Sequence, residues 1–196
     1  MPSEMIRDIA EAARKASRKL AVLSSAAKDT SLRHMAETLR HHATYLQEEN
    51  ARDLETAHAT GLSPAMIDRL TLSEKVIEGM ARGMEEIAEL PDPVGRITGM
   101  ARRPNGLVVG RMRIPLGVVA IIYESRPNVT ADAAALCLKS GNAVILRGGS
   151  EAIHSNAAIV KILRESLRST GIDPEAVGFI PVADRQAIMD MLRLED

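Results

Sequence analysis

The stretch from Pro115 to Ser150 limits the fold of this chain more than any other part of the sequence. Val118 to Ile122 and Val144 to Leu146 are short apolar runs rich in β-branched residues, which is typical of strands that are buried on both faces. Between these runs alanine and leucine recur at helical spacing, and Gly141 follows where a C-terminal glycine cap belongs. The stretch therefore predicts a right-handed strand–helix–strand unit, with a ligand crevice at the ends of its parallel strands.

The second of these strands leads directly into Arg147, Gly148, Gly149 and Ser150. Glycines let a backbone approach a ligand closely, and an arginine can bind a phosphate group. A single Gly-Gly-Ser sequence is a weak signal, so a phosphate-binding loop and an ordinary loop both remain open on spacing alone.

Helices are expected throughout the segment 1–95, because apolar residues recur there at helical spacing. Ser63 and Ser73 indicate helix starts, and Pro91 must end the last helix of this segment. The three clearest apolar faces, of which the second indicates one longer helix, consist of Ile6, Ile9, Ala10, Ala13, Ala16 and Leu20; of Leu32, Met35, Ala36, Leu39, Ala43 and Leu46; and of Val76, Ile77, Met80, Met84 and Ile87.

The segment 96–116 has a different character, because glycines and short apolar runs predict extended antiparallel strands there. The region 117–196 contains the strand–helix–strand unit, a further amphipathic helix and a third apparent parallel strand from Val177 to Val182. A last helix is expected from Arg185 to Leu194, with Asp184 as its cap. We therefore expect an α/β fold with a Rossmann-type parallel sheet and an N-terminal helical segment.

Three parallel strands leave two open sheet edges, whereas parallel sheets usually bury both faces and continue further. The sequence therefore predicts a truncated form of a longer protein.

The composition excludes several classes of partner. The formal net charge is −1, and the aromatic residues are two Tyr and one Phe, so no base-stacking surface for nucleic acid is expected. No apolar run approaches the roughly 20 residues of a membrane-spanning helix, and the N-terminus lacks the apolar core of a signal peptide. The histidines lack the spacing of a metal motif. These features predict a cytoplasmic protein that binds no nucleic acid, no membrane and no metal.

The sequence PLGVVAIIYESRPNVTADAAALCLKSGNAVILRGGSEA resembles the pattern of the aldehyde dehydrogenase superfamily, in which P-x-G-V-V, a polar turn and a helix precede G-N-x-V-x-x-[KR] and small residues. Within that superfamily, three segments resemble the γ-glutamyl phosphate reductase family: Leu90 to Gly95, Arg103 to Leu107 and Tyr123 to Val129. The resemblance covers nearly the whole chain.

This resemblance implies an aldehyde-dehydrogenase-like fold and the NADPH-dependent reduction of L-glutamyl 5-phosphate to L-glutamate 5-semialdehyde and phosphate in proline biosynthesis. In the family a cysteine thiolate attacks the acyl phosphate, phosphate leaves, and a hydride from NADPH reduces the thioacyl enzyme. The resemblance also implies that the segment 96–116 contains the strands by which subunits associate, and therefore a homo-oligomer. Two alternatives remain open: a non-catalytic NADP-binding remnant that acts by protein association, and another acyl-activating aldehyde dehydrogenase.

Cys137 is the only cysteine of the chain. It lies between two leucines near the C-terminal end of its predicted helix, where the helix dipole disfavours a thiolate, so a buried structural thiol is expected. The resemblance places the catalytic cysteine of the family in a later segment that this sequence does not contain. We therefore assign no catalytic residue in this chain.

We expect Arg147, Gly148, Gly149 and Ser150 to bind NADP(H). In the resembling NAD-linked enzymes a lysine occupies the position of Arg147 and an acid follows three residues later, where this chain has the neutral Ser150. The nearby acid Glu151 could point away, or it could pair with Arg147 and only order the loop.

We expect Arg126 and Asn128 to bind the acyl phosphate substrate. Their ordinary alternatives are a structural salt bridge for Arg126 and a helix cap for Asn128.

Overall fold

The computed structural model describes residues 4–182, 184 and 186–194. Within these ranges no helix is long and apolar enough to cross a membrane. The helices are α1 (Glu4–Leu20), α2 (Ser25–His41), α3 (Ala43–Ala59), α4 (Pro64–Leu70), α5 (Glu74–Glu89), α6 (Asn128–Lys139), α7 (Ile153–Ser169) and α8 (Gln186–Leu192), with short 3-10 turns η1 (Ser150–Ala152) and η2 (Pro174–Ala176). The strands are β1 (Ile97–Arg102), β2 (Val108–Met112), β3 (Val118–Ile122), β4 (Ala143–Arg147) and β5 (Val177–Phe179).

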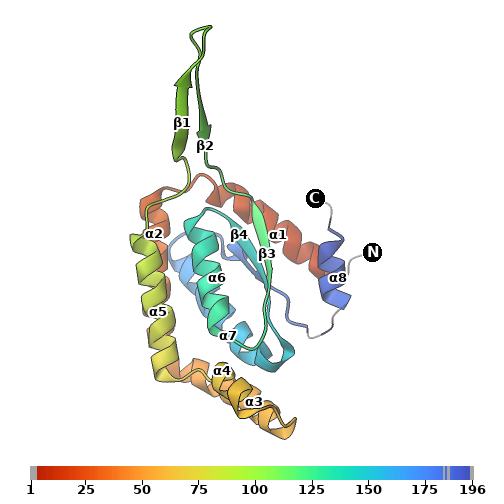
Figure 1. Ribbon diagram of the computed structural model, residues 1–196. Coiled ribbons are helices and arrows are strands. Elements are labelled where there is room, and N and C mark those ends of the chain that lie inside the picture. Colours follow the sequence, from red (N-terminus) through yellow and green to blue (C-terminus); the bar gives the residue numbers. More distant parts are fainter. Residues whose placement is uncertain (1–3, 183, 185, 195–196) are drawn as a thin grey trace.

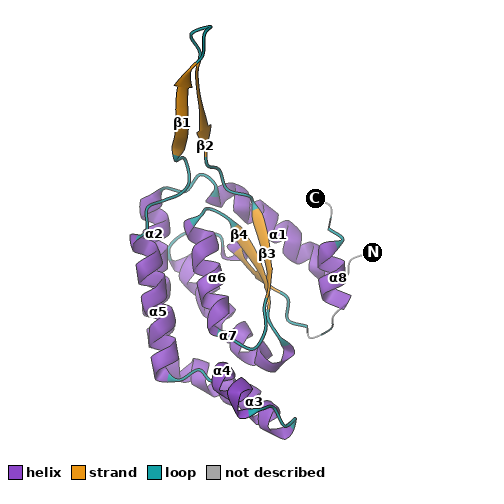
Figure 2. Ribbon diagram, in the orientation of Figure 1, coloured by secondary structure: helices purple, strands orange, loops and turns teal. Residues whose placement is uncertain are grey.

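The centre of the fold is a parallel sheet with the strand order β3-β4-β5. Helices α6 and α7 cover one face of this sheet and α1 covers the other (Figures 1 and 2). A single main hydrophobic core joins these helices and the sheet to α2 and α5. The strand–helix–strand prediction is therefore confirmed, and the N-terminal helices pack against it in the same core.

Burial of the strands differs from the expectation in one respect. All five residues of β4 are buried, as expected for a strand with neighbours on both sides. In β3, by contrast, Ala120 and Ile122 are exposed, so the prediction that this run is buried on both faces is wrong for the described chain. The reason is that, among the described strands, β3 pairs with β4 alone and forms an edge of the sheet.

The helical segment also contains one break that the apolar spacing did not predict. The expected longer helix through Leu46 is two helices, α2 and α3, separated at His42, whose backbone leaves the helical region with φ −100° and ψ 19°. The imidazole Nδ1 of His42 lies 2.9 Å from the carbonyl oxygen of Thr38 at this break. The two helices therefore run in different directions, and α3 lies beside α4 at the far end of the molecule from the β1–β2 hairpin (Figure 1).

At the C-terminal end, the carboxylate of Asp184 accepts a hydrogen bond from the backbone N–H of Gln186 at 2.8 Å, as a capping residue does. Arg185, the expected first residue of the last helix, lies outside the described residues.

Strands β1 and β2 form an antiparallel hairpin that projects away from the rest of the molecule (Figure 1). Every residue of both strands is exposed, including Ile97, Met100 and Met112. The prediction of antiparallel structure is confirmed, and the hairpin contributes nothing to the main core.

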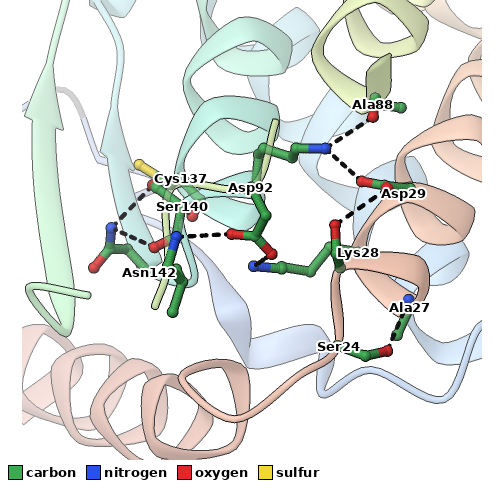
Figure 3. A network of polar contacts seen from close by, with 12 residues as sticks. Ser24, Ala27, Lys28, Asp29, Ala88, Asp92, Cys137, Ser140 and Asn142 are labelled. Atoms are coloured by element: carbon green, nitrogen blue, oxygen red, sulfur yellow. Dashed lines mark hydrogen bonds and ion pairs between the residues drawn. The ribbon is translucent and has the colours of Figure 1, made fainter. Parts of the chain in front are cut away.

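The base of the hairpin is fixed to the body by buried charges (Figure 3). Lys28 is only 1% exposed and forms an ion pair with Asp92, which also accepts a hydrogen bond from the N–H of Val94 at 2.9 Å. Nearby, the ammonium group of Lys139 contacts Asp29 at 2.5 Å and donates to the carbonyl of Ala88 at 2.8 Å. The Leu-Pro-Asp-Pro sequence therefore places a partly buried counter-ion to Lys28 where the chain leaves α5 for the hairpin.

The other strand of the hairpin is held by the turn between α6 and β4. The side-chain oxygen of Asn142 accepts a hydrogen bond from the N–H of Gly117 at 2.9 Å. Gly141 has a φ of +75°, and a Cβ atom there would crowd the side chains of Pro115 and Val94. Glycine is required at this position by both the conformation and the packing.

Candidate functional site

The candidate site lies where β3 and β4 end. We call residues 123–127 the β3–α6 turn and residues 148–152 the β4–α7 loop. Residues 123–125 of the turn and 149–151 of the loop border a hollow of about 800 Å³ together with Arg147. Its other walls come from the end of α3, from Leu62 and Met66, and from Ile188 and Met189 of α8. The predicted crevice at the carboxyl ends of the strands is therefore present, and its lining contains both apolar and polar side chains.

Both glycines of the β4–α7 loop lie where a Cβ atom would meet neighbouring side chains of the chain itself. A Cβ atom at Gly148 would overlap the side-chain amide of Asn156 and crowd the ring of Tyr123. A Cβ atom at Gly149 would overlap the carboxylate of Glu151. These contacts explain the Gly-Gly pair without a ligand, so the glycines alone are not evidence of a phosphate site.

Glu151 points toward the β3–α6 turn and not away from the loop. Its Oε1 accepts hydrogen bonds from the backbone N–H of Ser125 at 2.7 Å and from the Ser125 hydroxyl at 2.9 Å. Partial burial raises the pKa of the Glu151 carboxyl, but hydrogen bonds from its own N–H and from Ser125, together with the charge of Arg147, lower this pKa by more. Glu151 is therefore held as a carboxylate at neutral pH.

Arg147 ends β4 and is only 8% exposed, although it lines the hollow. Its positive charge acts on the carboxylate of Glu151. The geometry brings Arg147 to the hollow, as expected for a coenzyme contact, and it also brings Arg147 near the acid that the loop-ordering alternative requires. Both roles stay predictions.

A buried set of contacts lies beneath the two loops. The hydroxyl of Tyr123 lies 2.5 Å from the hydroxyl of Thr130, which donates to the side-chain oxygen of Asn156 at 2.8 Å. Burial raises the pKa of Tyr123 to about 12 even though the hydrogen bond with Thr130 acts in the opposite direction. This chain of contacts joins the end of β3 to the first turns of α6 and α7.

The N-terminus of α7 already has an anionic partner. The carboxylate of Asp53, on α3, accepts hydrogen bonds from the N–H groups of His154 at 3.1 Å and Ser155 at 2.8 Å and from the Ser155 hydroxyl at 2.6 Å. Asn50 of the same helix donates to Ser155 Oγ at 3.0 Å. The positive end of this helix dipole is therefore satisfied inside the protein, and a coenzyme phosphate would have to bind elsewhere in the hollow.

The residues expected to bind substrate lie in a second, smaller hollow. Arg126 and Asn128 line a space of about 410 Å³, together with Arg69, Asp68 and Asp132. Burial raises the pKa of the Asp132 carboxyl, an effect that a hydrogen bond from Asn128 partly offsets. The structure thus separates the expected substrate residues from the expected coenzyme residues.

Asn128 does not cap the following helix. Pro127 occupies the capping position, Asn128 is the first helical residue, and its amide donates to Asp132 Oδ2 at 3.4 Å. The capping alternative is therefore wrong, because the helix begins one residue earlier than the sequence suggested.

A model of the aldehyde dehydrogenase family matches residues 1–196. The chain belongs to this family.

Curated relatives in the family include a γ-glutamyl phosphate reductase of Geobacter sp. (strain M21), which is 58% identical over 194 residues, covering 99% of this chain and 46% of the relative. A γ-glutamyl phosphate reductase of Desulfatibacillum aliphaticivorans is 54% identical over the same length and the same shares. This family member therefore spans about half the length of the curated relatives that it matches, and it corresponds to their N-terminal portion.

Solved structures agree with this assignment. The crystal structure of γ-glutamyl phosphate reductase from Thermotoga maritima has 39% identity and a TM-score of 0.94, covering 96% of this chain and 46% of that chain. The enzyme of the same name from Saccharomyces cerevisiae has 33% identity and a TM-score of 0.87, covering 95% of this chain and 48% of that chain. The aldehyde-dehydrogenase-like α/β fold is therefore confirmed.

Membership of the aldehyde dehydrogenase family implies a nicotinamide coenzyme. The larger hollow fits such a group, because its apolar lining residues suit a planar ring and Arg147 and Ser150 suit a ribose or phosphate. Among the described residues, no group of three or more His, Cys, Asp or Glu side chains could hold a metal ion.

The thiol of this aldehyde dehydrogenase chain is structural. Cys137 is 7% exposed, and burial raises its pKa to about 11 (Figure 3). The prediction that Cys137 is buried is confirmed, and a neutral thiol in this setting is a poor nucleophile.

Sequence reasoning missed the polar residues that hold the site together. Asn50 and Asp53 fall between Leu46 and Ala57 on the buried face of α3. Polar side chains at core positions of an amphipathic helix need buried partners, so this spacing was an available signal. It could not have indicated that the partner is the start of α7.

Proposed function

We propose that this chain is the coenzyme-binding part of an enzyme that reduces L-glutamyl 5-phosphate to L-glutamate 5-semialdehyde and phosphate with NADPH, in proline biosynthesis. The observation that carries the proposal is the identity of 54–58% with curated γ-glutamyl phosphate reductases across 99% of this chain. The polar and apolar walls of the larger hollow give that activity a place to hold its coenzyme.

NADP(H) would bind in the hollow bordered by Arg147 and Ser150. A 2′-phosphate requires a cation and the absence of a competing acid, and Ser150 is a neutral, exposed side chain in the middle of the loop. The carboxylate of Glu151 is already bound to Ser125 and faces the charge of Arg147, which limits its repulsion of a phosphate. When bound, NADPH supplies the hydride of the reaction.

The acyl phosphate substrate would bind near the second hollow through Arg126 and Asn128. Arg126 is exposed and can bind an anion, whereas Asn128 and Asp132 form the neighbouring wall. This chain holds no candidate nucleophile, because Cys137 is buried with a raised pKa. The purified 196-residue chain is therefore expected to show no phosphate-dependent oxidation of glutamate semialdehyde, and such activity would contradict the proposal.

A homo-oligomer and a cytoplasmic location are parts of the same proposal. The hairpin of β1 and β2 exposes Ile97, Met100, Val108 and Met112, which is a large apolar surface for an isolated element. This exposure supports association of subunits through the hairpin.

Coenzyme titrations test the assignment of Arg147. We expect Arg147→Ala to weaken NADPH about ten- to a hundredfold, the equivalent of one charge-assisted contact of about 1.5–3 kcal/mol, with little change for NADH. Ser150→Glu is expected to shift the coenzyme preference from NADPH toward NADH, because it introduces an acid near the ribose. Arg168→Ala, on the exposed surface of α7, is the matched control.

Equal losses for both coenzymes in Arg147→Ala would exclude a 2′-phosphate contact. That result would show that Arg147 acts by ordering the loop around Glu151.

A further inference from the structure

The β3–α6 turn contains an unusual backbone conformation. Ser125 has a φ of +27°, and it is the only residue other than glycine with a positive φ among those the structure describes. The N–H of Arg126 donates to the carbonyl of Glu124 at 2.5 Å across it, which closes a tight three-residue turn. A residue with a Cβ atom stays in this region only where surrounding contacts hold it.

Those contacts come from the neighbouring loop. One oxygen of Glu151 accepts from both the N–H and the hydroxyl of Ser125, so a single carboxylate fixes the backbone and the side chain of the strained residue. The Gly149 position leaves space for this carboxylate, because a Cβ atom there would displace it. The loop thus contains both the acceptor and the space that the acceptor needs.

The two loops are also joined underneath. The contacts from Tyr123 through Thr130 to Asn156 join the β3–α6 turn to the first turn of α7, and Gly148 of the β4–α7 loop packs against Tyr123 and Asn156. Thr130 and Asn156 are buried, so these contacts are shielded from water. One link lies in the core and the other, through Glu151, lies at the border of the hollow.

We propose that Glu151 is a positioning residue that binds the β3–α6 turn to the β4–α7 loop, so that the two segments open and close as one unit. We call its hydrogen bonds to Ser125 the latch. The consequence for catalysis rests on the proposed function: a coenzyme bound against the loop would also fix the turn that leads to Arg126 and Asn128. Glu151 itself need not touch the coenzyme or the substrate.

Hydrogen exchange of the coenzyme-free chain, resolved to single amides by NMR, tests the latch. The N–H of Ser125 reports on the turn, and the N–H of Ala152, which donates to the carbonyl of Gly149, reports on the loop. We expect Glu151→Ala to accelerate exchange of both amides about tenfold or more, the effect of one lost charge-assisted hydrogen bond. Glu151→Gln keeps an acceptor oxygen and is expected to stay within about threefold of the unmodified chain.

The control is Glu165→Ala, which removes an exposed acid from α7 and is expected to leave both amides unchanged. Ser125→Ala removes only the hydroxyl donor and is expected to accelerate exchange of both amides by less than Glu151→Ala does. This milder variant provides the test if Glu151→Ala reduces the folded population. Acceleration of the Ser125 amide alone, with Ala152 unchanged, would overturn the latch and leave a local hydrogen bond. Equal acceleration in Glu151→Gln and Glu151→Ala would show that charge pairing with Arg147, and not the bonds to Ser125, protects the two amides. That result would refute the latch.

A second arm with saturating NADPH separates the latch from the proposed function. In the unmodified chain NADPH is expected to slow exchange at both amides, whereas in Glu151→Ala it should slow Ala152 and leave Ser125 unaffected. Slowing at Ser125 in Glu151→Ala would refute the coupling through Glu151. Failure of NADPH to bind the unmodified chain would count against the coenzyme site alone, because the coenzyme-free result decides the latch.

Discussion

Replacement of Asp53 by alanine should destabilise this chain more than removal of any exposed acid. Asp53 is 2% exposed, and its carboxylate accepts hydrogen bonds from two N–H groups and one hydroxyl in the first turn of α7. Alanine would leave the N–H and the hydroxyl of Ser155, which is fully buried, without this acceptor. An unsatisfied buried donor costs about 1–3 kcal/mol, so the two donors of Ser155 cost about 2–6 kcal/mol together, and loss of the anion at a helix N-terminus costs about 0.3–1 kcal/mol more.

We therefore expect Asp53→Ala to lower the free energy of unfolding by about 3–5 kcal/mol, a large part of the 5–15 kcal/mol typical of a domain. Urea unfolding followed by circular dichroism measures this change. Asp53→Asn keeps one acceptor oxygen and should lose about half as much. Glu55→Ala, an exposed acid two residues further along α3, is the control and should change stability by less than about 0.5 kcal/mol.

A double-mutant cycle sharpens the test. If the loss arises from stranded donors, Ser155→Ala should cost less in the Asp53→Ala background than in the unmodified chain, because both partners are then absent. A loss below about 1 kcal/mol for Asp53→Ala would refute the reasoning. Strict additivity of the two substitutions would do so as well.

Three further predictions follow from other buried groups. Cys137 is 7% exposed and burial raises its pKa to about 11. Its thiol should therefore react with iodoacetamide at pH 8 about a hundredfold more slowly in the native chain than in urea, as measured by mass spectrometry. Equal rates would contradict a structural thiol. Asp92→Ala leaves the ammonium group of Lys28 buried without its counter-ion, so it should cost about 3–5 kcal/mol in urea unfolding, and the pair Lys28→Met with Asp92→Leu should recover most of that loss. The pKa of Asp92 is lowered, since burial raises it but the bonds from Lys28 and Val94 lower it more, and the pKa of Glu151 is lowered in the same way. The stability that these two carboxylates contribute is present above their ordinary pKa values of 3.8 and 4.5, and it is lost as the pH falls through their lower pKa values in the folded chain. The urea midpoint should therefore stay constant from pH 7 to about pH 5 and decrease at pH values below about 4. A midpoint unchanged at pH 3 would contradict this.

Much of the fold could be predicted because it depends on local periodicity. The β-branched runs at 118–122 and 144–146 form strands, and Gly141 ends α6 with the positive φ that a glycine cap needs. The burial of Cys137 was predictable for the same reason, since its neighbours and its helix place it in the core. These features require only the residues within a few positions of one another.

The site could be located but not assembled from the sequence. The residues 147–150 lie at a strand end as expected, and Arg126 and Asn128 lie in a neighbouring turn, but their separation into two hollows depends on where α4 and α8 pack. The sequence does not decide where the Glu151 side chain points, because a side chain on a loop has no periodicity to fix its direction. Its bond to Ser125 exists only once the crossover through α6 brings β3 and β4 side by side.

Most of the helices and strands, and the class of fold, follow from hydrophobic spacing and from turn residues along continuous segments, although the break at His42 does not. Tertiary packing alone shows that Asp53 satisfies the start of α7, that the buried Lys28 pairs with the partly buried Asp92, and that β3 is an exposed edge. Asp53 and Ser155 are 102 positions apart, and no local pattern encodes such a pairing. The physical reason is that a buried polar group must find a partner, but which partner it finds depends on how the helices pack against the sheet.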